Sequence, residues 1–478
     1  MRNAKNRARR VNAAAALVLA AGVITIAACD RIKNELLEPQ NPGLVDQGAV
    51  GSPAAAAALK VGAIGRFKRL AYDSAPAGFA GSSVWEAAGL LTDEFSNSDF
   101  QNSQNDVDAR TMSPDNQASN YTRVTQARGY ITDAIAAEKQ FEPQKTSDIG
   151  ELYAALAFIE VNLAESFCNG IPLGSNKQGV VDYSSPDFKP LTNAEVYVVA
   201  LGHVDNALST LGSATDVATT FVRQLALITK ARILVDQGKF TEAAALVPSS
   251  TIPSSYQYLW TSSASNNNDD LGIWTLNNSI SRMTVGDSSM TYQGKTFRIF
   301  NAVPFASAND PRVPILKGTD AQLSAEDGLT PLFIQQVWKN RDDAIPAASG
   351  IDARLIEAEA LLNSGDYVGM TGILNALRAA PPSIGAFKPA AMAPLVAPTV
   401  KDDAVTLFFR EKAFWTFGRG QRLGDLRRLV RQYGRAQDQV FPTGQHYKGG
   451  NYGSDVNLPV PDAERVNPQF KGCLDRNA

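Results

Sequence analysis

Apolar residues recur at intervals of three and four through the middle of the chain, which is the spacing of one face of an α-helix. The clearest run predicts an amphipathic helix that starts at Asp148, an N-cap acid followed three residues later by Glu151. The apolar positions of this helix are Ile149, Leu152, Leu156, Ile159, Leu163 and Phe167. We expect this helix to pack its apolar face into the core.

A capping box formed by Thr192 and Glu195 predicts the start of another helix. His203 shares one face of this helix with Val196, Val199 and Ala207, so we expect it to face the core or its edge rather than to act in catalysis. Helices are predicted again from Ile351 onward and over residues 402–417, on either side of a Pro- and Ala-rich connector at 379–398. The last helix places Val405, Phe408, Phe409, Lys412 and Trp415 on adjoining faces.

Two predicted helix ends share a glycine followed by an aromatic residue. Gly238 precedes Phe240, with a small Ala243 further on, and Gly365 precedes Tyr367. This pattern is typical of the turn in tetratricopeptide-type helical hairpins, where the glycine forms the C-cap and the aromatic ring packs on the first helix. The second copy departs from the pattern at Met370, where a small residue is expected.

The character of the chain changes between residues 248 and 314, where Ser, Asn, Gly and aromatic residues replace the helical period. This composition predicts irregular structure with short strands at 272–276 and 296–302. Long irregular segments in compact proteins are usually functional or disordered, and disordered segments are poor in large rings. The aromatic residues here therefore indicate an ordered, functional region; they are Tyr256, Tyr258, Trp260, Trp274 and Tyr292.

The first 28 residues have the parts of a bacterial lipoprotein signal. Basic residues at positions 2, 5, 7, 9 and 10 precede an apolar run, and Ile26-Ala27-Ala28 leads directly into Cys29. This predicts that Cys29 is acylated and becomes the mature N-terminus, with residues 29–42 as a tether. The alternative is a short transmembrane anchor, but the apolar run is shorter than the roughly 18 residues expected of a spanning helix.

Composition narrows the functional classes. The mature chain keeps 40 of the 45 basic residues against 48 acidic ones, a net charge near −8, which argues against nucleic-acid binding. The whole chain has only two histidines, His203 and His446, so a multi-histidine metal site is excluded. We predict no metal and no cofactor.

Two cysteines remain after the lipidated one. In an exported compartment a leftover pair is more often bonded than free, which predicts a disulfide between Cys168 and Cys473. The alternative is two unrelated thiols.

No pattern typical of an enzyme is present: a nucleophile elbow, a zinc-protease motif and a Walker loop are all missing. The carboxylate pairs at 93–94 and 357–359 do not by themselves define a hydrolytic site, and we expect Glu357 and Glu359 simply to decorate a helix. We predict no catalytic residues. A basic and acidic series suits structural ion pairing better than an anion site; it comprises Arg410, Glu411, Arg422, Asp425, Arg427 and Arg428.

Ligand binding is better supported, because sugars present apolar C–H faces and a rim of hydroxyl groups that suit rings beside polar side chains. Two segments offer this mixture, 85–102 and 256–292. The candidate ligand contacts are Trp85, Asp93, Asn97, Phe100, Tyr256, Trp260, Trp274 and Tyr292. For Trp85 alone a core position is favoured, whereas Trp260 and Trp274, flanked by polar residues, favour ligand contact.

Several separated motifs together resemble the SusD/RagB family of outer-membrane nutrient-binding lipoproteins, over nearly the whole chain. After the lipobox come LLEPQNP at 36–42, LTDEF at 91–95, FCNGIPL at 167–173, NDPR at 309–312, LIEAEA at 355–360, NALR at 375–378, REKAF at 410–414 and GQRLGDLRR at 420–428. The chain departs from the family's habit at Trp415 and Arg419, where acids are common, and at Cys168.

The resemblance implies a mostly helical fold in which tetratricopeptide-like hairpins, at about 43–247 and 349–430, support an irregular, ligand-binding insert at about 248–348. A tail at 431–478 would complete a single SusD-like domain over 43–478. It also implies a lipid-anchored location on the outer membrane, a SusC-like TonB-dependent transporter as partner, and an oligosaccharide or a peptide as ligand. The alternative function is a lipid-anchored helical scaffold for envelope assembly without a small ligand.

Overall fold

The computed structural model describes residues 51–73, 83–116, 118–175, 181–262, 270–317 and 325–478. The predicted signal, the predicted lipidation site Cys29 and the predicted tether lie outside the described residues. Within these six ranges, no helix combines the length and apolar character that a membrane span requires.

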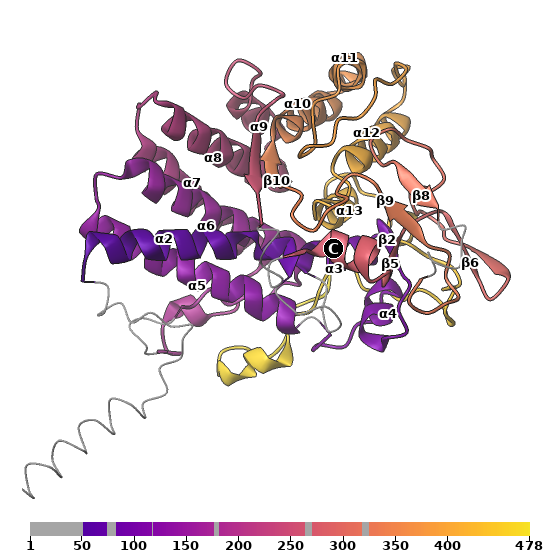
Figure 1. The fold of residues 1–478 in the computed structure, drawn as a ribbon, viewed down its shortest axis with the longest axis horizontal. Helices are drawn as coiled ribbons and strands as arrows, with labels where there is room; N and C mark the ends of the chain where they lie inside the picture. The colour runs from indigo at the N-terminus through magenta and orange to yellow at the C-terminus, as the bar shows by residue number, and fades with distance from the viewer. Residues whose placement is uncertain (1–50, 74–82, 117, 176–180, 263–269, 318–324) are drawn as a thin grey trace, which may run out of the picture. The chain divides into compact units, whose positions relative to one another are not determined.

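Helices dominate the described chain and pack mainly on their sequence neighbours (Figure 1). In chain order they are α2 (Pro53–Phe67), α3 (Val84–Leu91), α4 (Asn102–Asp108), α5 (Ala118–Phe141), α6 (Thr146–Ser166), α7 (Asn193–Leu211), α8 (Val217–Asp236), α9 (Phe240–Leu246), α10 (Gly350–Ser364), α11 (Tyr367–Ala379), α12 (Lys401–Trp415) and α13 (Arg422–Arg431). Helix α6 packs against α5, α7 and α8, and α10 packs against α9 and α11. The predicted mostly helical fold of successive hairpins is confirmed.

Strands are short and pair two by two, all antiparallel. The pairs are β1 (Tyr72–Asp73) with β4 (Asp270–Leu271), β2 (Phe95–Asn97) with β5 (Met283–Val285), β3 (Gln257–Trp260) with β10 (Ile345–Ser349), β6 (Ser289–Tyr292) with β7 (Lys295–Arg298), and β8 (Ile315–Lys317) with β9 (Phe333–Gln335). In Figure 1 the strands β2, β5, β8 and β9 gather on the side away from α7 and α8.

Of the two predicted helix starts, the one at Thr192 is confirmed and the one at Asp148 is displaced. At α7, Thr192 Oγ1 accepts a hydrogen bond from the backbone N–H of Glu195 at 3.2 Å, and Glu195 Oε2 accepts one from the N–H of Thr192 at 2.8 Å. Helix α6 instead begins at Thr146. Asp148 therefore lies in its first turn, where it is not the N-cap but an ion-pair partner of Lys60 at 3.1 Å.

The glycine-and-aromatic turns of the hairpins are confirmed. Gly238 (φ +75°) and Gly365 (φ +85°) both adopt positive φ, which a residue with a Cβ tolerates poorly. Phe240 and Ala243 are buried between the helices. Met370 is also fully buried, so the second hairpin accommodates the larger residue in its core.

The strand predicted at 272–276 is wrong. Strand β4 ends at Leu271, and Trp274–Ser279 forms a short π-helical segment. A short apolar run cannot distinguish a strand from a buried helical turn by periodicity alone. The strand predicted at 296–302 exists as β7, but it ends at Arg298.

Candidate ligand-binding site

Two tryptophans predicted or considered as ligand contacts lie in the core instead. The side chain of Trp85 is 1% exposed and that of Trp260 is 3% exposed, and their ring centroids are 4.9 Å apart. Phe67 and Phe158 pack edge-on against the Trp260 ring. Trp260 is drawn inward because β3 pairs with β10, which places its ring between helices despite polar neighbours in sequence. Neither tryptophan has a surface to offer a ligand.

The remaining aromatic candidates of the predicted insert divide between core and surface. Tyr256 is buried, and its hydroxyl donates to the carbonyl oxygen of Phe221 at 2.9 Å, so it too is a core residue rather than a ligand contact. Trp274 is half-buried and packs against the main core. Tyr292 is half-buried at the end of β6.

Asp93 and Asn97 are completely buried, so they lie beneath the surface rather than on it. The hydroxyl of Tyr452 donates to Asp93 Oδ1 at 3.4 Å, and the hydroxyl of Tyr447 donates to the carbonyl oxygen of Asn97 at 2.6 Å. Burial, together with the charge of nearby Asp108, raises the pKa of Asp93 well above its ordinary value. These two residues support the surface and do not contact a ligand directly.

Phe100 and Tyr292 lie on two segments of the chain that Lys448 contacts. Phe100 is 68% exposed, more than Phe221 and Phe300, the other exposed phenylalanines of the described residues. Lys448 links the segments of Phe100 and Tyr292: its Nζ donates to the carbonyl oxygen of Asp99, next to Phe100, and lies 5.9 Å from the ring centroid of Tyr292. We call the surface formed by Phe100, Tyr292, Phe297, Asp327 and Lys448 the Phe100–Tyr292 surface.

The β6–β7 hairpin contributes two of these rings on one face. In its register Met290 lies opposite Phe297 and Tyr292 lies opposite Lys295, so these four residues share a face. That face packs on the buried Tyr447 and Tyr452, with the rings of Tyr292 and Tyr447 5.9 Å apart. The hairpin is therefore held by its aromatic face.

The two charged residues of the Phe100–Tyr292 surface, Lys448 and Asp327, form an ion pair. Lys448 Nζ lies 2.7 Å from Asp327 Oδ2, and both side chains are largely buried. Burial alone would raise the pKa of Asp327, but hydrogen bonds from Lys448 and Thr330 lower it below the ordinary value. Burial and the Asp327 charge raise the pKa of Tyr292, so its hydroxyl stays protonated and can donate a hydrogen bond.

This arrangement presents one exposed ring, Phe100, with the half-buried rings of Tyr292 and Phe297. Such rings can stack on a ligand, and the phenol hydroxyl of Tyr292 can hydrogen-bond to it. Among the residues that the structure describes, no group of three His, Cys, Asp or Glu side chains is placed to hold a metal ion.

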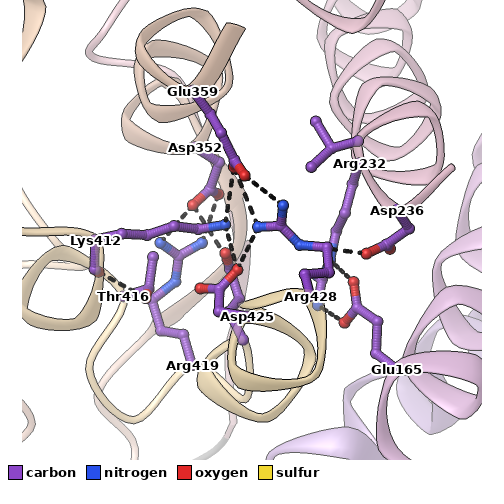
Figure 2. A network of polar contacts seen from close by, with 12 residues as sticks. Glu165, Arg232, Asp236, Asp352, Glu359, Lys412, Thr416, Arg419, Asp425 and Arg428 are labelled. Atoms are coloured by element: carbon purple, nitrogen blue, oxygen red, sulfur yellow. Dashed lines mark hydrogen bonds and ion pairs between the residues drawn. The ribbon is translucent and has the colours of Figure 1, made fainter. Parts of the chain in front are cut away.

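Two members of the Arg and acid series, Asp425 and Arg428, belong to a buried ion network that joins the two halves of the helical scaffold (Figure 2). Arg428 pairs with Glu359 and, at 2.7 Å, with Asp425, which also accepts from Lys412 at 2.7 Å. Nearby, Arg419 pairs with Asp352 at 2.7 Å. Structural ion pairing is thus confirmed for Asp425 and Arg428, and also for Glu411, which pairs with Arg312 at 2.6 Å. Arg422 and Arg427 instead donate to backbone carbonyl oxygens, and Arg410 is exposed. Glu359 is 1% exposed, however, so the expectation that it decorates a helix surface is wrong.

The network surrounds a cavity of about 30 Å³ lined by Glu165, Arg232, Asp236, Lys412, Asp425 and Arg428, among others. This space suits one or two water molecules and is far too small for a sugar. Arg232 Nε donates to Glu165 Oε1 at 2.6 Å, and burial raises the pKa of Asp236 well above its ordinary value, as does the charge of Glu165. The cavity belongs to the scaffold, not to a binding site.

Cys168 and Cys473 form the expected disulfide, with Cα atoms 5.9 Å apart. The bond joins the loop after α6 to the C-terminal tail. Hydrogen bonds reinforce the same junction: Leu458 N–H donates to the carbonyl oxygen of Ser166, and Asn169 donates to Asp475 at 2.9 Å. The tail is thereby fastened to the helical scaffold, and its earlier part carries Lys448 to the candidate site.

His203 lies at the edge of the core, as the helical pattern predicts. Its Nδ1 is 2.7 Å from Glu160 Oε2, and its ring stacks on Tyr153 with centroids 6.4 Å apart. The contact is a structural one between α6 and α7.

Solved structures similar to this fold share one description. A SusD superfamily protein from Bacteroides vulgatus matches with a TM-score of 0.58 and 15% identity, over 89% of this chain and 100% of that chain. A SusD-like protein from Bacteroides fragilis matches with a TM-score of 0.58 and 11% identity, over 89% and 97%. A SusD-like carbohydrate binding protein, also from Bacteroides fragilis, matches with a TM-score of 0.56 and 14% identity, over 88% and 99%.

The chain has the SusD-like fold. At these identities the likeness concerns the fold alone. No family model matches the sequence, and no curated protein matches it either.

Within the SusD-like fold, three residues of the Phe100–Tyr292 surface escaped sequence reasoning. Phe297 lies two residues after Lys295, the spacing of residues on one face of a strand. The Gln293-Gly294 pair between the two strands is a typical signal for a hairpin turn. Asp327 and Lys448 precede glycines at 328 and 449, which indicates turns but not a shared surface. Their contact joins segments more than a hundred residues apart, and no local pattern predicts it.

Proposed function

We propose that this protein is a glycan-binding lipoprotein of the outer membrane that passes its ligand to a TonB-dependent transporter without catalysis. The observation that carries the proposal is the SusD-like fold, which covers nearly the whole chain. One of the similar structures is described as a carbohydrate binding protein. The Phe100–Tyr292 surface supports the ligand class, because an exposed ring with half-buried rings and a phenol hydroxyl suits a saccharide.

The test of binding uses the full mature chain on a glycan array, followed by calorimetry with the glycans that bind. Phe100→Ala and Tyr292→Ala should each weaken binding by about threefold to thirtyfold, the effect of losing one stacking ring. Phe300→Ala is the matched control, because Phe300 is also exposed but pairs with Thr443 outside the Phe100–Tyr292 surface. Absence of saturable binding to any glycan would reject the ligand class and favour the scaffold function.

The anchor and the partner rest on the sequence motifs. The lipobox at 26–29 supports acylation of Cys29, and the resemblance to SusD/RagB lipoproteins supports a transporter partner. Mass spectrometry of the N-terminal peptide should show an acylated Cys29, and Cys29→Ala should release the protein from the membrane. Affinity capture from native outer membranes should recover a large barrel protein. Recovery of the chain without any transporter would remove the partner from the proposal.

A further inference from the structure

Each face of the β6–β7 hairpin carries one basic residue of β7. Because neighbouring residues of a strand point to opposite faces, Lys295 shares the face of Tyr292 and Phe297, whereas Arg298 lies on the other face opposite Ser289. Both basic side chains are exposed. Only Lys295 is therefore on the ring-bearing face of the hairpin, which carries Tyr292 and Phe297 of the Phe100–Tyr292 surface.

Lys295 has an aromatic contact but no acidic one. Its Nζ lies 4.8 Å from the ring centroid of Phe297, and among the residues that the structure describes no carboxylate is within ion-pair distance. An ammonium held over a ring keeps its hydrogen-bond donors available on the side away from the ring.

The other charges near this surface are already matched. Asp327 accepts from Lys448, from the hydroxyl of Thr330 and from the backbone N–H groups of Leu329 and Thr330. Arg282 lies 3.6 Å from Asp99 and 3.8 Å from Glu326. Within the described part of the chain, Lys295 thus remains the unmatched charge on the ring-bearing face, in a mature chain whose overall balance is strongly acidic.

We propose that the glycan bound at the Phe100–Tyr292 surface is acidic, and that Lys295 pairs with its carboxylate or sulfate group. This inference rests on the proposed function and names the ligand class for the same site. The rings contact the apolar sugar faces, and the ammonium group of Lys295 selects saccharides that carry an anion.

The test compares saccharides that differ only in charge. The full mature chain is titrated with oligogalacturonate and with its methyl ester, and with a keratan sulfate oligosaccharide, which has no uronic acid, and its desulfated form. The two pairs distinguish a carboxylate from a sulfate. We expect one acidic member to bind more tightly than its neutral counterpart, with a preference that declines as salt is raised. Lys295→Gln should weaken binding of that acidic member by about twofold to tenfold and leave the neutral member unchanged.

Arg298→Gln is the matched control, since it removes an equally exposed charge from the opposite face and should change neither affinity. Thermal melting of both variants verifies that they are folded. If neutral and acidic members bind equally, or if Lys295→Gln changes nothing, Lys295 serves only to keep the exposed strand soluble and the inference is overturned while glycan binding stands. If no glycan of the array or of these pairs binds, the proposed function itself fails.

Discussion

Lys448 Nζ lies 2.7 Å from Asp327 Oδ2 and also donates to the carbonyl oxygen of Asp99. One side chain of the C-terminal tail therefore joins two other segments of the chain, one before Phe100 and one before Thr330. Other bonds hold the same segments: the backbone N–H of Asp327 donates to the carbonyl oxygen of Ser98 at 3.0 Å, and Asn97 Nδ2 donates to that of Asp99 at 3.2 Å. Lys448 is therefore the charged member of a set of contacts that positions Phe100.

Removing that cation should loosen the site and destabilise the protein. Lys448→Met leaves the nearly buried Asp327 carboxylate without its partner, so we expect a loss of about 3 kcal/mol in the free energy of unfolding. Glycan affinity should fall as well, because Phe100 loses part of its support. Urea unfolding and calorimetry measure the two effects.

The pH dependence identifies the cause. The pKa of Asp327 is lowered in the folded state, so its contribution is present above the ordinary value of 3.8 and is lost as the pH falls through the lowered one. The difference between the wild type and Lys448→Met should accordingly shrink in acid. Lys295→Met, which removes an exposed lysine nearby, should change the unfolding free energy by less than about 0.5 kcal/mol. An equal loss in both variants would contradict the link.

Glu94 makes a contribution to stability whose pH dependence is opposite to that of Asp327, because its pKa is raised rather than lowered. It is completely buried at the end of α3, and burial raises its pKa from 4.5 to about 8 despite the charge of Arg422. The folded state therefore holds a proton that the unfolded state releases above pH 4.5. This contribution is fully present below pH 4.5 and is lost as the pH rises to about 8.

Glu94→Gln mimics the protonated carboxyl group and should flatten the fall in unfolding free energy between about pH 5 and 8 by a few kcal/mol, as urea unfolding at a series of pH values would show. Glu195→Gln is the control: Glu195 is exposed and the hydrogen bond from the backbone of Thr192 lowers its pKa. That variant should keep the fall over the same pH range. A wild-type slope retained by Glu94→Gln would assign the effect to other groups.

The helical scaffold could be predicted because its determinants are local. The period of apolar residues, the Thr192–Glu195 capping box and the glycines at 238 and 365 each report on a few neighbouring residues, and the structure agrees with them. The disulfide could be predicted because elimination left a single pair of cysteines. The displaced start of α6 shows the limit, since Asp148 has an N-cap side chain but pairs with Lys60 instead.

The candidate site was predicted only in part, for a physical reason. A large ring beside polar residues suits both a ligand surface and the end of a core strand, and sequence does not reveal which neighbours cover it. Trp260 is covered through the pairing of β3 with β10, whereas Phe100 remains exposed. The contacts that decide between these outcomes are long-range, as between Lys448 and Asp327.

The buried ion network makes two neighbouring glutamates of α10 very different. Glu359 accepts two hydrogen bonds from Arg428 and is 1% exposed, whereas Glu357 is half-buried and pairs with Arg354 within its own helix. Glu359→Gln should cost about 3–5 kcal/mol, because Arg428 would keep its charge with a weakened partner. Glu357→Gln should cost less than about 1 kcal/mol. Urea unfolding of the two variants checks the contrast, which equal losses would contradict.

The disulfide should contribute chiefly to stability rather than to binding. Cys168 and Cys473 are 305 residues apart in sequence, so the bond closes a very long loop of the unfolded chain. Loop-closure entropy then predicts a loss of about 2–5 kcal/mol in the free energy of unfolding for the double variant Cys168→Ser with Cys473→Ser. Glycan affinity should stay within about twofold, because hydrogen bonds such as that from Asn169 to Asp475 keep the tail in place.

Reduction of the wild type with dithiothreitol should reproduce the loss, while the double serine variant should be insensitive to the reductant. Asn169→Ala keeps the disulfide but removes the hydrogen bonds of this side chain to Asp475 and from the backbone N–H of Asn193, and should cost about 1–3 kcal/mol. Urea unfolding compares the three proteins, with and without reductant. If the double variant unfolds at the same urea concentration as the wild type, the hydrogen-bonded junction alone holds the tail, and the disulfide adds nothing to the stability of the folded state.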